Sequence, residues 1–133
     1  MRDAAEYLTH VHALIIANAG IVHWSVVRED GQGTLGMLRY RLTLRDGGLV
    51  EAFELFEVVA GRLNVKTYSF HWQDAAGRLQ RRWDNAAHRP EVPTHPYHVH
   101  EGEEMTVREH GPVSLEEILA SVTAEASHPN DAP

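Results

Sequence analysis

Four histidines and three prolines lie within the stretch RWDNAAHRPEVPTHPYHVH, residues 82–100. The prolines remove backbone donors and favour extended conformations in the residues that precede them. In an extended segment, His98 and His100 are two residues apart and project to the same side. Two imidazoles on one side of a stiff segment have three ordinary uses: metal coordination, general acid–base catalysis, or a surface position without a chemical task.

A metal site in this stretch needs a third ligand besides two imidazoles. The candidates are His88, His95, Asp84 and Glu101. The spacing matches neither HExxH nor a Cys/His signature, and the chain has no cysteine. We therefore predict no metal cofactor. The alternative is a divalent metal such as zinc, held by His88, His98 and His100.

The residues just before the histidine-rich stretch alternate as in a β-strand. Tyr68, Phe70 and Trp72 alternate with Ser69 and His71. A hairpin in which Gln73 faces Arg78 places His71 opposite Gln80 and Ser69 opposite Arg82. This register predicts that His71 and Arg82 share one face. Asp84 and Asn85 follow as turn residues that bond back to their own backbone.

The rest of the chain supplies the elements that position these groups. An apolar stripe at Ala4, Leu8, Val11 and Ile15 predicts an N-terminal helix that ends at residues 18–20. Strands are predicted near 21–28, 37–45, 49–59, 63–73 and 79–84, joined by short turns, so neighbouring strands should be antiparallel.

The C-terminal helix has the clearest start signal. Ser114 and Glu117 form a capping box, and Leu115, Ile118 and Val122 continue the buried stripe. The predicted class is α+β, an antiparallel sheet of about five strands flanked by an N-terminal and a C-terminal helix on one face. We expect one domain over residues 1–127 and a flexible tail over 128–133.

Charge and composition limit the possible partners. The net charge of −7 argues against indiscriminate nucleic-acid binding, but residues 62–100 are locally basic, with six Lys/Arg against three Asp/Glu. No apolar run approaches the roughly 20 residues that span a bilayer, and the N-terminus has no export pattern. We expect a cytoplasmic protein without a membrane partner.

Two motifs together resemble a known family. YSFHWQDAAGRLQRRWDNAAH followed by HPYHVHEGEE is similar to the TumE-like toxins of type II toxin–antitoxin systems, over roughly residues 49–119. His71, Trp83, Asp84, Asn85, His88, His98 and His100 match the family's pattern. The chain departs from it at Ala87, Arg89, Tyr97 and Val99, where proline, histidine, histidine and lysine are usual.

The resemblance implies a toxin, an antitoxin partner encoded by a neighbouring gene, and RNA as a possible substrate; a homodimer is a further possibility. The alternative functions are a metal-binding hydrolase and a non-catalytic interaction module with a His-rich metal site. The residues fit metal-independent RNA cleavage, in which imidazoles transfer protons and a guanidinium stabilises the phosphorane. The candidate catalytic residues are His71, Arg82, His88, His98 and His100, and the candidate substrate-binding residues are Asp84, Asn85 and Tyr97. We expect His98 and His100 to be exposed, so that truncating either changes stability by no more than roughly 0.5 kcal/mol.

Overall fold

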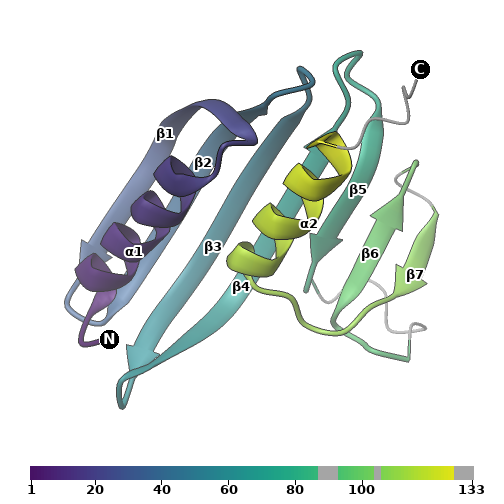
Figure 1. Cartoon of the computed structure of the whole chain (residues 1–133). Helices are drawn as coiled ribbons and strands as arrows, with labels where there is room; N and C mark the ends of the chain where they lie inside the picture. Colours follow the sequence, from purple (N-terminus) through teal and green to yellow (C-terminus); the bar gives the residue numbers. More distant parts are fainter. Residues whose placement is uncertain (87–92, 104–105, 128–133) are drawn as a thin grey trace.

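The computed structural model describes residues 1–86, 93–103 and 106–127, in which a helix, seven strands and a second helix follow one another along the chain (Figure 1). The elements are α1 (Ala4–Ala17), β1 (Ile21–Gln32), β2 (Leu35–Leu44), β3 (Leu49–Val59), β4 (Arg62–Gln73), β5 (Leu79–Asp84), β6 (His98–Glu101), β7 (Val107–Glu109) and α2 (Leu115–Ser127).

The seven strands of the described residues form one antiparallel sheet, and their order in space is their order along the chain. Both helices lie on the same face of this sheet (Figure 1). The predicted α+β class is therefore confirmed, but the strand count of about five was wrong. The two additional strands, β6 and β7, have four and three residues, which is too short for an alternating pattern to be recognised.

Helix α1 begins and ends where the sequence indicates. The carboxylate of Asp3 accepts a hydrogen bond from the Glu6 backbone N–H at 2.9 Å, which caps the N-terminus. At the other end, the Asn18 N–H donates to the Ile15 carbonyl at 3.1 Å. The buried side chains of α1 are Ala4, Tyr7, Leu8, Val11 and Ile15.

The hairpin between β4 and β5 sets the register of the candidate site. Asp74 accepts hydrogen bonds from the Ala76 and Arg78 backbone N–H groups, both at 2.9 Å, and Gly77 supplies the positive φ of 85° that the turn requires. The predicted pairing of His71 with Gln80 was wrong.

In the observed register, His71 lies opposite Arg82, and Ser69 lies opposite Asp84. Gln73 pairs with Leu79 instead of Arg78, and an irregularity between Trp72 and Gln73 adds a second residue to the shift. Such a bulge gives no signal in a single sequence. The prediction that His71 and Arg82 share a face holds, because the shift moves partners by two residues.

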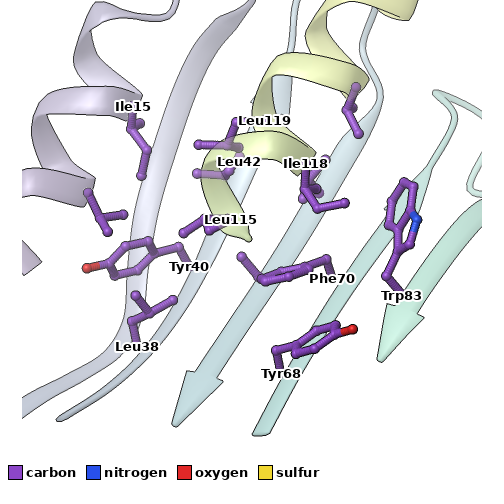
Figure 2. Close-up of a cluster of buried hydrophobic side chains, with 14 of the residues drawn as sticks. Ile15, Leu38, Tyr40, Leu42, Tyr68, Phe70, Trp83, Leu115, Ile118 and Leu119 are labelled. Atoms are coloured by element: carbon purple, nitrogen blue, oxygen red, sulfur yellow. The ribbon is translucent and has the colours of Figure 1, made fainter. Parts of the chain in front are cut away.

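The core lies between the sheet and the two helices (Figure 2). Strand β2 supplies Leu38, Tyr40, Leu42 and Leu44 to it, as its alternation predicts. Helix α2 covers the middle of the sheet with Leu115, Ile118, Leu119 and Val122, all buried. Trp83 of β5 and Val99 of β6 extend the same core toward the far edge.

The capping box of α2 is present. The Ser114 N–H donates to Glu117 Oε1 at 3.0 Å, and the Glu117 N–H donates to Ser114 Oγ at 3.1 Å. The predicted tail at 128–133 lies outside the described residues. Among the described residues, no helix is both long enough and apolar enough to span a membrane.

Candidate active site

The pairing of β5 with β6 brings the predicted site residues together. Asp84 lies opposite His98, and Arg82 lies opposite His100. Because side chains alternate along a strand, these four project to one side while Trp83 and Val99 enter the core on the other. The cluster therefore occupies the sheet face opposite the helices. His71 of β4 lies beside Arg82 of β5 on the same face.

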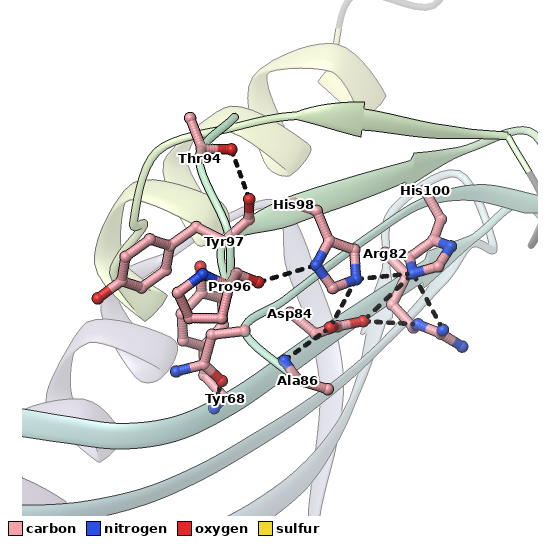
Figure 3. A network of polar contacts seen from close by, with 10 residues as sticks. Tyr68, Arg82, Asp84, Ala86, Thr94, Pro96, Tyr97, His98 and His100 are labelled. Carbon is pink, nitrogen blue, oxygen red and sulfur yellow. Dashed lines mark hydrogen bonds and ion pairs between the residues drawn. The ribbon is translucent and has the colours of Figure 1, made fainter. Parts of the chain in front are cut away.

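Asp84 is at the centre of the cluster (Figure 3). Its Oδ1 lies 2.8 Å from His98 Nε2, and its Oδ2 lies 3.4 Å from His100 Nε2. The two Nε2 atoms are 3.1 Å apart. Arg82 completes the group: its Nε lies 3.3 Å from Asp84 Oδ2, and its Nη2 lies 3.2 Å from His100 Nε2.

The two histidines are buried, and the expectation of exposed histidines was wrong. His98 and His100 each expose 1% of their surface, and Asp84 exposes 4%. The reason is that HVHE forms a strand between β5 and β7 instead of a loop, with Val99 anchored in the core. The Arg82 side chain is 27% exposed and lies at the accessible edge of the cluster.

Backbone groups hold the ring of His98 and the carboxylate of Asp84 in place. His98 Nδ1 donates to the Pro96 carbonyl at 2.9 Å, and the Ala86 N–H donates to Asp84 Oδ1 at 3.0 Å. Thr94 Oγ1 donates to the Tyr97 carbonyl at 2.6 Å and accepts from the His110 N–H at 2.9 Å. Thr94 is absent from the predicted site residues, because its one signal in the sequence is a position in a turn before a strand.

The predicted substrate-binding residues have different surroundings. Asp84 bonds back to its own turn as expected, but Asn85 bonds across to β4. Its Oδ1 accepts from the Tyr68 N–H at 2.9 Å, and its Nδ2 donates to the Lys66 carbonyl at 3.0 Å. These bonds tie the end of β5 to its neighbour, so Asn85 has a structural task whatever else it does.

The aromatic side chains lie on the core side. Trp83 is 4% exposed and packs in the core, which leaves it no face for stacking on a base. The Tyr97 ring packs against the core and stacks near Tyr68, with ring centroids 6.5 Å apart and an interplanar angle of 13°. Substrate binding by Tyr97 stays a prediction.

Two of the three alternative metal ligands, His98 and His100, converge with Asp84. One ligand atom from each of these three residues lies within 4.8 Å of the others. The third member of the predicted set, His88, lies outside the described residues, as do Ala87 and Arg89.

A cleft of about 430 Å³ lies on the opposite side of the same strands. Its lining includes Arg81, Trp83, Val99, Glu101, Arg108 and Ile118. Because Trp83 and Val99 point toward the helices, this cleft is separated from His98 and His100 by the sheet itself. The sequence did not indicate it, since its walls come from β5, β6, β7 and α2.

A second buried acid lies away from the site, in the core beneath α1. Glu54 of β3 is 1% exposed, and Tyr7 donates a hydrogen bond to its Oε1 at 2.6 Å. Its Oε2 has no hydrogen-bond partner among the described residues. Burial raises the pKa of Glu54 to about 7, although the hydrogen bond from Tyr7 opposes the shift.

A family model with the description "Toxin TumE" matches residues 11–128. The chain belongs to the TumE toxin family. The match covers a longer part of the chain than the motifs in residues 49–119 indicate, because it includes the second half of α1 and all of α2. No curated protein and no solved structure matches the chain. Membership in the TumE family supports a toxin role and implies an antitoxin partner.

Proposed function

We propose that this TumE family member exerts its toxicity by cleaving RNA, at a reaction centre around Arg82. The observation that supports this is the position of Arg82: its partly exposed guanidinium has His71 on one neighbouring strand and His100 on the other. A guanidinium binds phosphate through parallel hydrogen bonds, and imidazoles transfer protons near neutral pH.

The reaction that suits these groups is transesterification within RNA. A base removes the proton of the ribose 2′-OH, and the oxygen attacks phosphorus as the P–O5′ bond breaks. An acid gives a proton to the departing 5′-oxygen. The products are a 2′,3′-cyclic phosphate and a 5′-hydroxyl. Arg82 would stabilise the charge on the phosphorane.

The spacing of the imidazoles favours one pair over another. A base and an acid on opposite sides of phosphorus each need a hydrogen bond of about 2.8 Å, which sets their nitrogens more than about 5 Å apart. His98 and His100 are only 3.1 Å apart at Nε2, so no phosphate fits between them in this arrangement. His71 and His100 lie on strands two spacings apart, about 10 Å, with Arg82 between them.

We therefore assign one proton transfer to His71, whose Nε2 lies 3.2 Å from Gln73 Oε1 at the partly buried surface of β4. The second catalytic function falls to the group formed by Asp84, His98 and His100. This division of the two proton transfers uses both sequence motifs, the one that includes His71 on β4 and the one that includes His98 and His100 on β6.

The test is cleavage of a single-stranded RNA by the purified full chain, with the product ends identified. Arg82→Ala should lower the rate by roughly 100- to 1,000-fold, as for loss of one charge-stabilising donor. His71→Ala should lower it by roughly 100- to 10,000-fold. Arg62→Ala and His10→Ala, at exposed positions on the far end of β4 and on α1, are the matched controls.

Full activity in both Arg82→Ala and His71→Ala would overturn this assignment of the reaction centre. If the wild-type chain arrests growth but leaves purified RNA intact, the toxin acts by another route.

A further inference from the structure

Potential ligand atoms from three residues converge at the centre of the buried cluster: the Nε2 atoms of His98 and His100 and both carboxylate oxygens of Asp84, with one atom from each residue within 4.8 Å of the others. The separations are 2.8 Å between His98 Nε2 and Asp84 Oδ1, 3.1 Å between the two Nε2 atoms, and 3.4 Å between His100 Nε2 and Asp84 Oδ2. A tetrahedral ion with ligand bonds of about 2.0–2.1 Å holds its ligand atoms roughly 3.3 Å from one another. The observed separations are close to that spacing without rearrangement of the strands.

The hydrogen-bond partners of His98 and His100 indicate which ring nitrogens carry protons and which carry lone pairs. The Pro96 carbonyl is only an acceptor, so the Nδ1 of His98 must carry a proton. The Nε2 of a neutral His98 is then a lone pair. Arg82 is only a donor, so the Nε2 of His100 accepts from it and is a lone pair as well.

These two lone pairs and the Asp84 carboxylate form a group of potential metal ligands, with the Arg82 guanidinium at its edge. One ion at the centre would contact all three residues at once. The hydrogen bond from Nδ1 of His98 to a backbone carbonyl is the usual way in which a metal-binding imidazole is oriented.

Burial is the second feature that such a site requires. His98, His100 and Asp84 are each at most 4% exposed, and they belong to two paired strands whose other face is fixed in the core. The metal-binding side chains are therefore held in place before an ion binds, which lowers the free-energy cost of binding.

We propose that Asp84, His98 and His100 bind one divalent transition-metal ion of the zinc class. Two imidazoles and one carboxylate form a donor set suited to zinc and to ferrous iron, and unsuited to calcium or magnesium, which prefer oxygen ligands. Arg82 and the ion are rivals for the His100 lone pair, so binding the ion turns the guanidinium toward the accessible face. There the ion and Arg82 act on the same phosphate, a consequence that rests on the proposed RNA cleavage.

The binding test uses the full chain, stripped with a chelator and titrated with zinc in a calorimeter, without RNA. We expect one ion per chain. His98→Ala, His100→Ala and Asp84→Asn should each weaken binding by at least about 100-fold, the upper range for loss of an outer-shell partner. His71→Ala and His110→Ala should bind as the wild type does, which controls for the ten histidines of the chain.

Arg82→Gln provides the sharpest comparison. Because it removes the competing cation and keeps all three ligands, it should bind zinc at least as tightly as the wild type. Loss of binding in Arg82→Gln, or stoichiometric binding that survives both His98→Ala and Asp84→Asn, would overturn the proposal. So would the absence of stoichiometric binding in the wild type.

Cobalt substitution covers the case in which a ligand variant does not fold. The stripped wild-type chain loaded with Co²⁺ should show the intense visible absorption of a tetrahedral or five-coordinate ion, and zinc should remove it. A spectrum identical to aqueous cobalt would overturn the site. Metal binding without RNA cleavage would sustain the site and defeat only the proposed function.

Discussion

At the scale of single residues, Asp84 connects every part of the candidate site. Its two oxygens contact His98, His100 and Arg82, and its own turn supplies a backbone N–H from Ala86. A buried carboxylate without partners costs several kcal/mol, so the histidines and the guanidinium stabilise the carboxylate as much as it orients them.

Truncating either buried histidine should lower stability as well as activity. His98→Ala or His100→Ala removes a buried ring and leaves Asp84 with one partner fewer, so the free energy of unfolding should fall by about 2–4 kcal/mol. His71→Ala, at a partly buried surface position, should change it by less than about 1 kcal/mol. Urea unfolding of the three variants measures the difference, and equal midpoints would contradict it.

Glu54 should make the stability of the protein depend on pH. Its pKa is about 7 in the folded chain, because burial disfavours the charged form, against 4.5 for the ordinary group. The protonated form is thus favoured by folding. This stabilisation is fully present below pH 4.5 and is lost as the pH rises through 7, a change on the order of 3 kcal/mol.

Glu54→Gln should flatten this part of the stability curve, because the amide does not titrate. Chemical unfolding between pH 4.5 and 8 measures it. Tyr7→Phe is the complementary variant: it removes the hydrogen bond that lowers the Glu54 pKa, so the loss of stability with rising pH should become larger. A Glu54→Gln curve parallel to that of the wild type would show that another group is responsible.

At the scale of elements, β6 links the site to the core. Val99 packs beside Trp83 on one face, while His98 and His100 meet β5 on the other. The turn before β6 is fixed by the Thr94 hydroxyl, which bonds both the Tyr97 carbonyl and the His110 N–H. This clamp joins the start of β6 to the segment that follows β7.

Replacing Thr94 by valine keeps the shape of the side chain and removes both bonds. The free energy of unfolding should fall by about 1–3 kcal/mol, since a partly buried N–H and a partly buried carbonyl lose their partner. Thr67→Val, at an exposed position on β4, is the matched control and should change stability little. If the loss is local, amide exchange near His98 will accelerate before global unfolding does.

At the scale of the whole molecule, the sheet has one face covered by both helices and a second face that carries the candidate site (Figure 1). The core beneath the helices is continuous from α1 to Val99 and includes no residue of the proposed metal site. We therefore expect the fold to persist without an ion and the site to depend on the fold.

Expression of the chain alone should slow bacterial growth, because it belongs to a toxin family. Co-expression of the neighbouring gene product should restore growth if that product is its antitoxin. Growth curves with soluble protein confirmed by blotting measure both effects. Arg82→Ala, produced at the same level, should be less toxic if the proposed centre carries the activity.

The sequence by itself determined the helices, five of the strands and the pattern of the core. Asp3 and the capping box of Ser114 and Glu117 act through local hydrogen bonds, and the alternation in β2 reflects burial on one face. Such signals lie within a few residues of one another and need no tertiary contact to be recognised. The spacing of His98 and His100 likewise fixed that they share a side.

The tertiary structure alone decided how these groups are arranged and how far they are buried. The pairing of Gln73 with Leu79 and the bulge at Trp72 and Gln73 together set His71 opposite Arg82, and the pairing of β5 with β6 brought Asp84 beside two histidines. A four-residue strand has too few positions to show a period, so only its partners make it a strand. That pairing also places its histidines beside Asp84 and Arg82, and contacts with β5 and β7 are long-range ones that local sequence does not encode.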